Sequence, residues 1–243
     1  MTSAAPKLIL AHSSDLHIDD GYTMRAWNGD GNGPLAAVIE TACTANTDIL
    51  LLTGDVFEHN RLKNEVLDRT RSLLMDAPFP VVMLPGNHDP LTPRSVWERA
   101  KLDELNNVHV IDRNQHTAIY SDYDLHIWGK AHIDYMDMSP LTGAPSRTAK
   151  YHVVSGHGHY VEIAPPKDKQ SASWLITSDD IEAAGADYVA LGHWNVSTQV
   201  GQPSSPAYYS GAPDYAETIN IVEFWSDRVP KIKQHPVLGL PGK

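Results

Sequence analysis

A chain of 243 residues with an ordinary hydrophobic fraction of 42% has room for one large globular domain, and none of its apolar runs approaches the length of a membrane span. Nineteen Lys and Arg against thirty Asp and Glu give a formal charge of −11, which disfavours long polyanions such as nucleic acid unless something compensates locally. The single Cys43 excludes an internal disulfide, and the N-terminal residues show no leader pattern, so we expect a soluble, cytoplasmic protein in which residues 1–243 form a single domain.

The first half of the chain alternates apolar runs with helical patterns. Strands are predicted at 7–15, at 48–55 and from Val81 onward, and helices near 34–45 and 63–75. Strands that alternate with helical patterns of ten or more residues are typical of a sheet with parallel strands and covering helices. This half therefore predicts an α/β fold.

The second half has a different texture. From VHVID at 108–112 onward, short apolar runs follow one another, namely TAIYS, LHIWG, YHVVSG, DYVALG, PAYYSG and NIVEFW. They predict a second, more antiparallel sheet. Two stretches without a regular pattern, 132–150 and 161–173, are rich in Pro, Ser and charge. Because long loops in compact domains are often functional, we expect 134–150 and 161–173 to control substrate access.

Polar side chains follow the first two apolar runs, at the point where each predicted strand ends. Asp15 and His17 are two residues apart, so both point to the same face of an extended segment and can converge on one cation. After the second run, Gly54 allows a tight turn before Asp55. A single Gly-Asp pair is more often a turn than a ligand, so these residues gain meaning only with the rest.

Three later runs end in the same way, in LPGNHD, SGHGH and LGHWN. The polar residues at these ends are Asn87, His88, Asp89, His157, His159, His193 and Asn195. Turn chemistry explains each end by itself, because Gly, Asn and Asp are common turn formers. It does not explain the recurrence at five strand ends, which is where α/β sheets place their chemistry.

The residue types indicate metal ions. Carboxylate and amide oxygens together with imidazole nitrogens, without a thiolate, suit Mn²⁺, Fe²⁺ or Zn²⁺. One carboxylate shared between two cations holds them about 3.5–4 Å apart, where they can grip both the attacking and the leaving oxygen of a phosphoryl displacement. Such cations would also offset negative charge where an anionic substrate must lie.

The motifs and their order resemble those of calcineurin-like metallophosphoesterases. They are DLH at 15–17, GD at 54–55, GNHD at 86–89, the Gly-flanked His157 and GH at 192–193. Three further stretches, GDVFEHNR, VHVID and AYYSGAPDYAE, are similar to the SbcD-type nuclease subunit of DNA double-strand-break repair complexes. The resemblance implies a four-layer αββα sandwich, with two mixed β-sheets face to face and helices outside.

The resemblance also implies a role for each matched residue. The first of two divalent ions would be bound by Asp15, His17, Asp55 and residue 195, and the second by Asp55, Asn87, His157 and His193, so that Asp55 bridges them. His88 matches the catalytic His of the family, and Asp89 is expected to orient it and favour its protonated form. Mn²⁺ is expected first, with Fe²⁺ or Zn²⁺ as alternatives, and a water or hydroxide between the ions would attack phosphorus.

The sequence departs from the family pattern at GHWN, where Asn195 stands in place of a second His. An amide oxygen is a weaker donor than imidazole for late transition metals. We therefore expect the first ion site to fill with reduced affinity, or His159 to compensate. The break-repair nucleases also carry a DNA-binding region beyond the catalytic domain, which we do not expect within residues 1–243, so we expect a nucleotide or a short oligonucleotide end to compete with DNA as a substrate.

The sequence thus predicts a metal-dependent phosphodiesterase, with DNA or RNA ends among its candidate substrates. Two alternatives stay open: a small-molecule phosphodiesterase or phosphomonoesterase, and a non-catalytic scaffold of the same fold that binds a protein partner. The intact Asp15, His17 and Asn87–Asp89 favour catalysis, because a scaffold has no need of them. We expect no membrane association, and the sequence identifies no partner protein.

Overall fold

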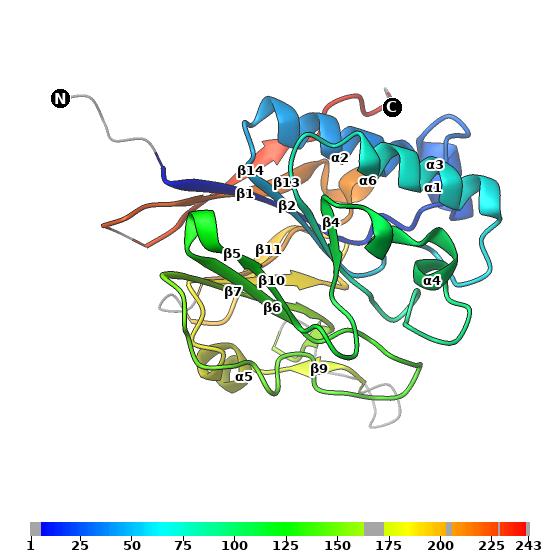
Figure 1. Ribbon diagram of the computed structural model, residues 1–243. Helices are drawn as coiled ribbons and strands as arrows, with labels where there is room; N and C mark the ends of the chain where they lie inside the picture. Colours follow the sequence, from blue (N-terminus) through cyan, green and yellow to red (C-terminus); the bar gives the residue numbers. More distant parts are fainter. Residues whose placement is uncertain (1–5, 163–172, 203–205, 228, 242–243) are drawn as a thin grey trace.

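Two six-stranded β-sheets lie face to face in the computed structural model, which describes residues 6–162, 173–202, 206–227 and 229–241 (Figure 1). In spatial order, the first sheet consists of β14 (Lys231–Pro236), β13 (Thr218–Phe224), β1 (Leu8–Ser13), β2 (Ile49–Thr53), β3 (Val81–Leu84) and β4 (Val108–Val110). The strands from β1 to β4 are parallel to one another, and β13 is antiparallel to both of its neighbours.

The second sheet corrects the expectation of a more antiparallel arrangement. In spatial order it consists of β11 (Thr198–Val200), β12 (Ala207–Tyr209), β10 (Tyr188–Gly192), β7 (Tyr151–His157), β6 (Leu125–Gly129) and β5 (Thr117–Tyr120). Its four inner strands are parallel, and only the two outer pairs, β11–β12 and β5–β6, are antiparallel. The prediction was wrong because the crossovers between parallel strands carry little helix here, so the runs looked like hairpins. The run NIVEFW lies in β13 of the first sheet.

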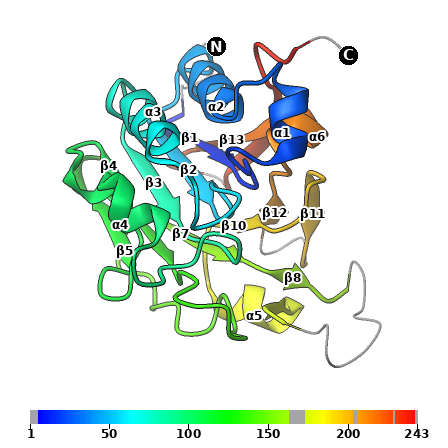
Figure 2. The ribbon, with the colours of Figure 1, turned by 90° about the vertical axis from the view of Figure 1, so that its right-hand side faces the viewer.

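Helices cover the outer faces of both sheets, which gives the expected four-layer sandwich (Figures 1 and 2). Over the first sheet lie α1 (Gly21–Ala26), α2 (Gly33–Thr44), α3 (Asn64–Met75), α4 (Val96–Ala100) and α6 (Pro213–Ala216), and against the second lies α5 (Ser178–Ala183). The remaining elements are the 3₁₀ helices Leu102–Glu104 and Ser121–Tyr123 and the short parallel pair β8 (His159–Tyr160) and β9 (Leu175–Ile176).

The continuous apolar strands are explained by burial on both faces. In β1, Leu8 and Leu10 pack between the two sheets, whereas Ile9 and Ala11 face the helices. A strand that is covered on both sides needs apolar residues at every position, not at alternate ones. By contrast, β14 is an edge strand in which no side chain is buried, and its polar sequence gave no apolar signal.

The long segment 132–150 contains no helix or strand, as predicted. Of the second predicted loop, residues 163–172 lie outside the described part of the chain. None of the described helices is both long and apolar enough to cross a membrane. The carboxyl ends of β1, β2, β3, β7 and β10 meet at one end of the sandwich, and the polar motifs of the sequence follow those ends.

Candidate metal centre

The loops that follow β1, β2 and β10 hold four polar residues in left-handed backbone conformations. The φ angles are 54° at Asp15, 44° at His17, 50° at Asp55 and 110° at His193. Non-glycine residues seldom adopt positive φ, and such residues gather at functional sites. The loops also fix one another, because the Asp15 N–H donates to the Gly54 carbonyl at 3.1 Å and the His17 N–H to the Asp55 carbonyl at 3.0 Å.

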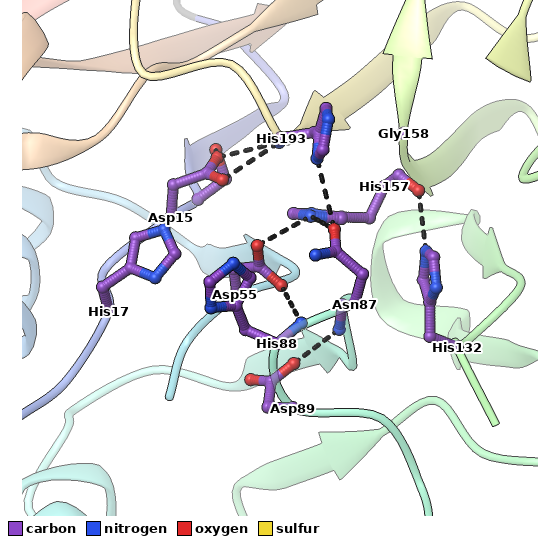
Figure 3. A network of polar contacts seen from close by, with 12 residues as sticks. Asp15, His17, Asp55, Asn87, His88, Asp89, His132, His157, Gly158 and His193 are labelled. Carbon is purple, nitrogen blue, oxygen red and sulfur yellow. Dashed lines mark hydrogen bonds and ion pairs between the residues drawn. The ribbon is translucent and has the colours of Figure 1, made fainter. Parts of the chain in front are cut away.

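Four side chains from both sheets converge in the buried half of the site (Figure 3). His157 Nε2 lies 3.1 Å from Asp55 Oδ2 and 3.1 Å from Asn87 Oδ1, and the same amide oxygen lies 3.2 Å from His193 Nδ1. Ligand atoms of Asp55, His157 and His193 all lie within 4.8 Å of one another. A carboxylate, an amide oxygen and two imidazoles at this spacing form a donor set that fits a divalent cation.

Glycine is required where the strand ends meet at this point. A Cβ on Gly192 would lie 1.9 Å from the Thr53 carbonyl oxygen and 2.7 Å from His157 Nδ1, and one on Gly54 would lie 2.1 Å from the same nitrogen. Backbone thus approaches the His157 ring from two sides. The Gly of the Gly-Asp and Gly-His motifs is explained by this close packing.

A second group lies in the partly exposed half of the site. Ligand atoms of Asp15, His17 and Asp55 also lie within 4.8 Å of one another. Both Asp15 carboxylate oxygens accept the His193 backbone N–H, at 3.1 and 3.0 Å, which ties this half to the buried half. Asp55 belongs to both groups, so the structure places it between two sets of candidate ligands.

Burial and charge set the protonation of the buried half. Burial acts to raise the pKa of Asp55, but the charge and hydrogen bond of His157 outweigh it, so that the pKa of this carboxyl is lowered. Burial acts to lower the pKa of His157, but Asp55 raises it to about 9. Burial lowers the pKa of His193 to about 3 and leaves it neutral at pH 7. The site therefore holds one proton on His157, in a place where a cation would compete for it.

The carboxylate beside the His88 ring belongs to Glu58 and not to Asp89. Asp89 is fully buried, and its carboxylate accepts the N–H groups of Phe57 at 2.9 Å and Gly86 at 2.6 Å, so it holds the backbone of the loops and does not contact the His88 ring. The Asp89 carboxylate is needed for these two hydrogen bonds, because the two buried N–H groups would otherwise lack a partner. Burial raises its pKa to about 7.

Glu58 lies between two histidines. Its Oε2 is 2.8 Å from His17 Nδ1 and 3.4 Å from His88 Nδ1, and its backbone carbonyl accepts the His88 Nδ1–H at 3.1 Å. The hydrogen bond to Glu58 raises the pKa of His88 to about 9. Sequence reasoning gave Glu58 no role. The signal in the sequence was its position three residues after Asp55. In the structure this segment pairs with the His17 loop through a parallel β-bridge between Ile18 and Phe57.

The remaining predicted residues lie at the margin of the site. Asn195 is exposed, its backbone carbonyl accepts the Ala212 N–H at 3.1 Å, and its side chain has no partner among the described residues. The His159 ring lies 6.2 Å from the His193 ring. His132 lies directly behind the site, where its Nε2–H donates to the His157 carbonyl at 2.9 Å (Figure 3).

Comparison with known proteins agrees with this fold. Among curated proteins, the DNA double-strand break repair protein Mre11 of Methanopyrus kandleri is 24% identical over 227 residues, which cover 84% of this chain and 48% of that protein. The chain thus spans about half the length of this relative.

Two solved structures share the fold at low sequence identity. A putative 5′-nucleotidase from Staphylococcus aureus has a TM-score of 0.62 at 14% identity, over 97% of this chain and 55% of that one. A dimetal phosphatase from Danio rerio has a TM-score of 0.60 at 10% identity, over 95% and 96%. The family model described as calcineurin-like phosphoesterase matches residues 9–229. The chain belongs to the calcineurin-like phosphoesterase family.

Proposed function

We propose that this protein is a metal-dependent phosphodiesterase with a dinuclear centre. The observation that carries the proposal is the position of Asp55, which belongs to two groups of candidate ligands at the meeting point of the two sheets. One carboxylate between two such groups is what a pair of ions about 3.5–4 Å apart requires.

The candidate ligands divide into two sets, one for each ion. The first ion would be held by Asp15, His17, Asp55 and residue 195, and the second by Asp55, Asn87, His157 and His193. Oxygen and imidazole donors without thiolate favour Mn²⁺, with Fe²⁺ or Zn²⁺ as alternatives. The chemistry that two such ions supply is activation of a water molecule and neutralisation of phosphate oxygens.

Among the protein's own side chains, His88 would assist the departure of the leaving group. Its Nδ1–H is fixed on Glu58, which leaves Nε2 as the nitrogen that can donate a proton or a hydrogen bond to the leaving oxygen. A pKa of about 9 keeps the ring protonated at neutral pH, as this role requires. We assign Glu58, and not Asp89, to the orientation of His88.

For the substrate, we infer a small phosphodiester or a short DNA or RNA end. The named activity of the Mre11 relative supports a nucleic-acid end. The formal charge of −11 opposes the binding of a long polyanion. A phosphomonoesterase is the second candidate, which the fold shared with a protein named as a dimetal phosphatase supports.

The test is Mn²⁺-dependent hydrolysis of bis-p-nitrophenyl phosphate beside p-nitrophenyl phosphate. We expect faster turnover of the diester, complete loss with EDTA, and a loss in kcat of about 10²–10⁴-fold in His88→Ala, with bound metal unchanged. His235→Ala, which changes a partly exposed histidine on β14, is the matched control. Preference for the monoester would select the second candidate. If metal-loaded protein hydrolysed neither ester, the proposal would fail, and a scaffold that binds a protein partner would take its place.

A further inference from the structure

Three aromatic side chains form a surface beside His193 that the proposed reaction does not use. The Trp174 and His159 rings each lie 6.2 Å from the His193 ring, at 74° and 85° to it. The Trp194 ring lies 5.7 Å from His159 at 33°, which is closer to parallel. All three side chains are partly exposed. We refer to Trp174, His159 and Trp194 as the aromatic wall.

The aromatic wall is held by backbone and by the long loop. The His159 N–H donates to the Trp174 carbonyl at 2.9 Å, next to the β8–β9 pair, and Trp194 directly follows His193 at the end of β10. Trp174 is fixed from the other side, because its Nε1–H donates to the Met136 carbonyl at 3.0 Å and its backbone N–H to Asp137 Oδ1 at 2.7 Å. The rings are therefore fixed relative to the candidate ligand His193.

The aromatic wall lies on the His193 side of the metal centre, away from His88. His88, which would serve the leaving group, groups with His17 and Glu58, whereas His193 groups with Asp55 and His157. The wall adjoins His193, and so it lies beyond the opposite half of the metal centre from His88. The two ester groups of a diester diverge from phosphorus, so a leaving group that points toward His88 leaves the other ester group room on the His193 side, beside the wall.

We propose that the aromatic wall stacks a nucleobase, so that the preferred substrates are diesters with a nucleoside on the non-leaving side. This inference rests on the proposed function. A base presents a flat π face to indole and imidazole rings, and stacking of one base changes binding by about 5- to 150-fold. Stacking needs no cationic groups, which fits a chain of formal charge −11. The ions would take the phosphate, and the wall would select the base.

The experiment compares thymidine 5′-(p-nitrophenyl phosphate) with methyl p-nitrophenyl phosphate. Both diesters carry the same charge and the same leaving group, so the ratio of their kcat/KM values isolates the nucleoside. We expect a ratio of at least about 5 in the wild type, close to 1 in Trp194→Leu, and largely restored in Trp194→Phe. Trp225→Leu, which changes a partly exposed tryptophan beyond the opposite end of the strands, is the control and should keep the wild-type ratio.

A wild-type ratio near 1 would overturn the inference, and so would a ratio that Trp194→Leu leaves unchanged. Failure to hydrolyse either diester would instead count against the proposed function, which separates the two outcomes. Should Trp194→Leu not fold, inhibition of methyl-ester hydrolysis in the wild type takes its place. Thymidine should then inhibit at least about 5-fold more strongly than 2-deoxyribose, and equal inhibition would refute base stacking.

Discussion

Replacement of Glu58 by Gln tests the assignment of His88 most directly. Gln keeps the size of the side chain and the backbone carbonyl that accepts the His88 Nδ1–H, and it removes only the carboxylate charge. At pH 8 a pKa of about 9 keeps roughly 90% of His88 protonated, whereas the ordinary value of about 6.5 would keep roughly 3%. The variant should therefore lose up to about 30-fold in kcat at pH 8 and little at pH 6.

The assay is a pH profile of kcat for bis-p-nitrophenyl phosphate at saturating Mn²⁺. The fall in rate on the alkaline side should move to lower pH in Glu58→Gln, and Glu104→Gln, an exposed carboxylate beside Arg71, should keep the wild-type profile. Because Glu58 raises the pKa of His88, this ion pair also stabilises the fold below pH about 6.5, and the contribution disappears as pH rises through about 9. An equal loss of kcat at every pH would refute the reasoning.

Three further predictions concern the metal centre. Gly192→Ala should destabilise the protein by about 2–3 kcal/mol in urea unfolding, because its Cβ would meet the Thr53 carbonyl oxygen at 1.9 Å, while Gly21→Ala should not. Mn²⁺ uptake at pH 7 should release a proton from His157, because a pKa of about 9 keeps this ring charged in the metal-free protein. Titration calorimetry in two buffers of different ionisation enthalpy measures the number of protons released, and a value of zero would contradict the prediction. Asn195→His should tighten Mn²⁺ binding, and an unchanged Kd would exclude residue 195 as a ligand of the first ion.

The part of the first sheet from β1 to β3 could be predicted because these strands are buried on both faces. That burial makes the apolar runs at β1, β2 and β3 continuous, and the helical patterns between them mark the crossovers. The same logic failed for the second sheet, where the segment from β6 to β7 crosses over without any helix. The spacing of apolar residues indicates how a strand is buried. It does not indicate the direction of the strand when the connecting segment has no helical pattern.

The candidate ligands could be predicted because strand ends place them, whereas their supporting partners could not. Asp15, Asp55 and His193 lie within two residues of the end of a strand, so topology brings them together. Whether Asp89 or Glu58 reaches His88 depends on how two loops turn, and Asp89 is the nearer in sequence. Its carboxylate is taken by two buried N–H groups, a demand of tertiary structure that the string GNHD does not display.

The division of the candidate ligands between the two sheets has a consequence for the lifetime of the protein. Asp15, Asp55 and Asn87 follow strands of the first sheet, and His157 and His193 come from the second. Ions held by both sets would act as cross-links between the halves of the sandwich. Free metal at 100 times its Kd would then add about 2.7 kcal/mol per ion to the free energy of unfolding. The metal-depleted protein would therefore be degraded faster by proteases than the metal-loaded protein, whether or not substrate is present.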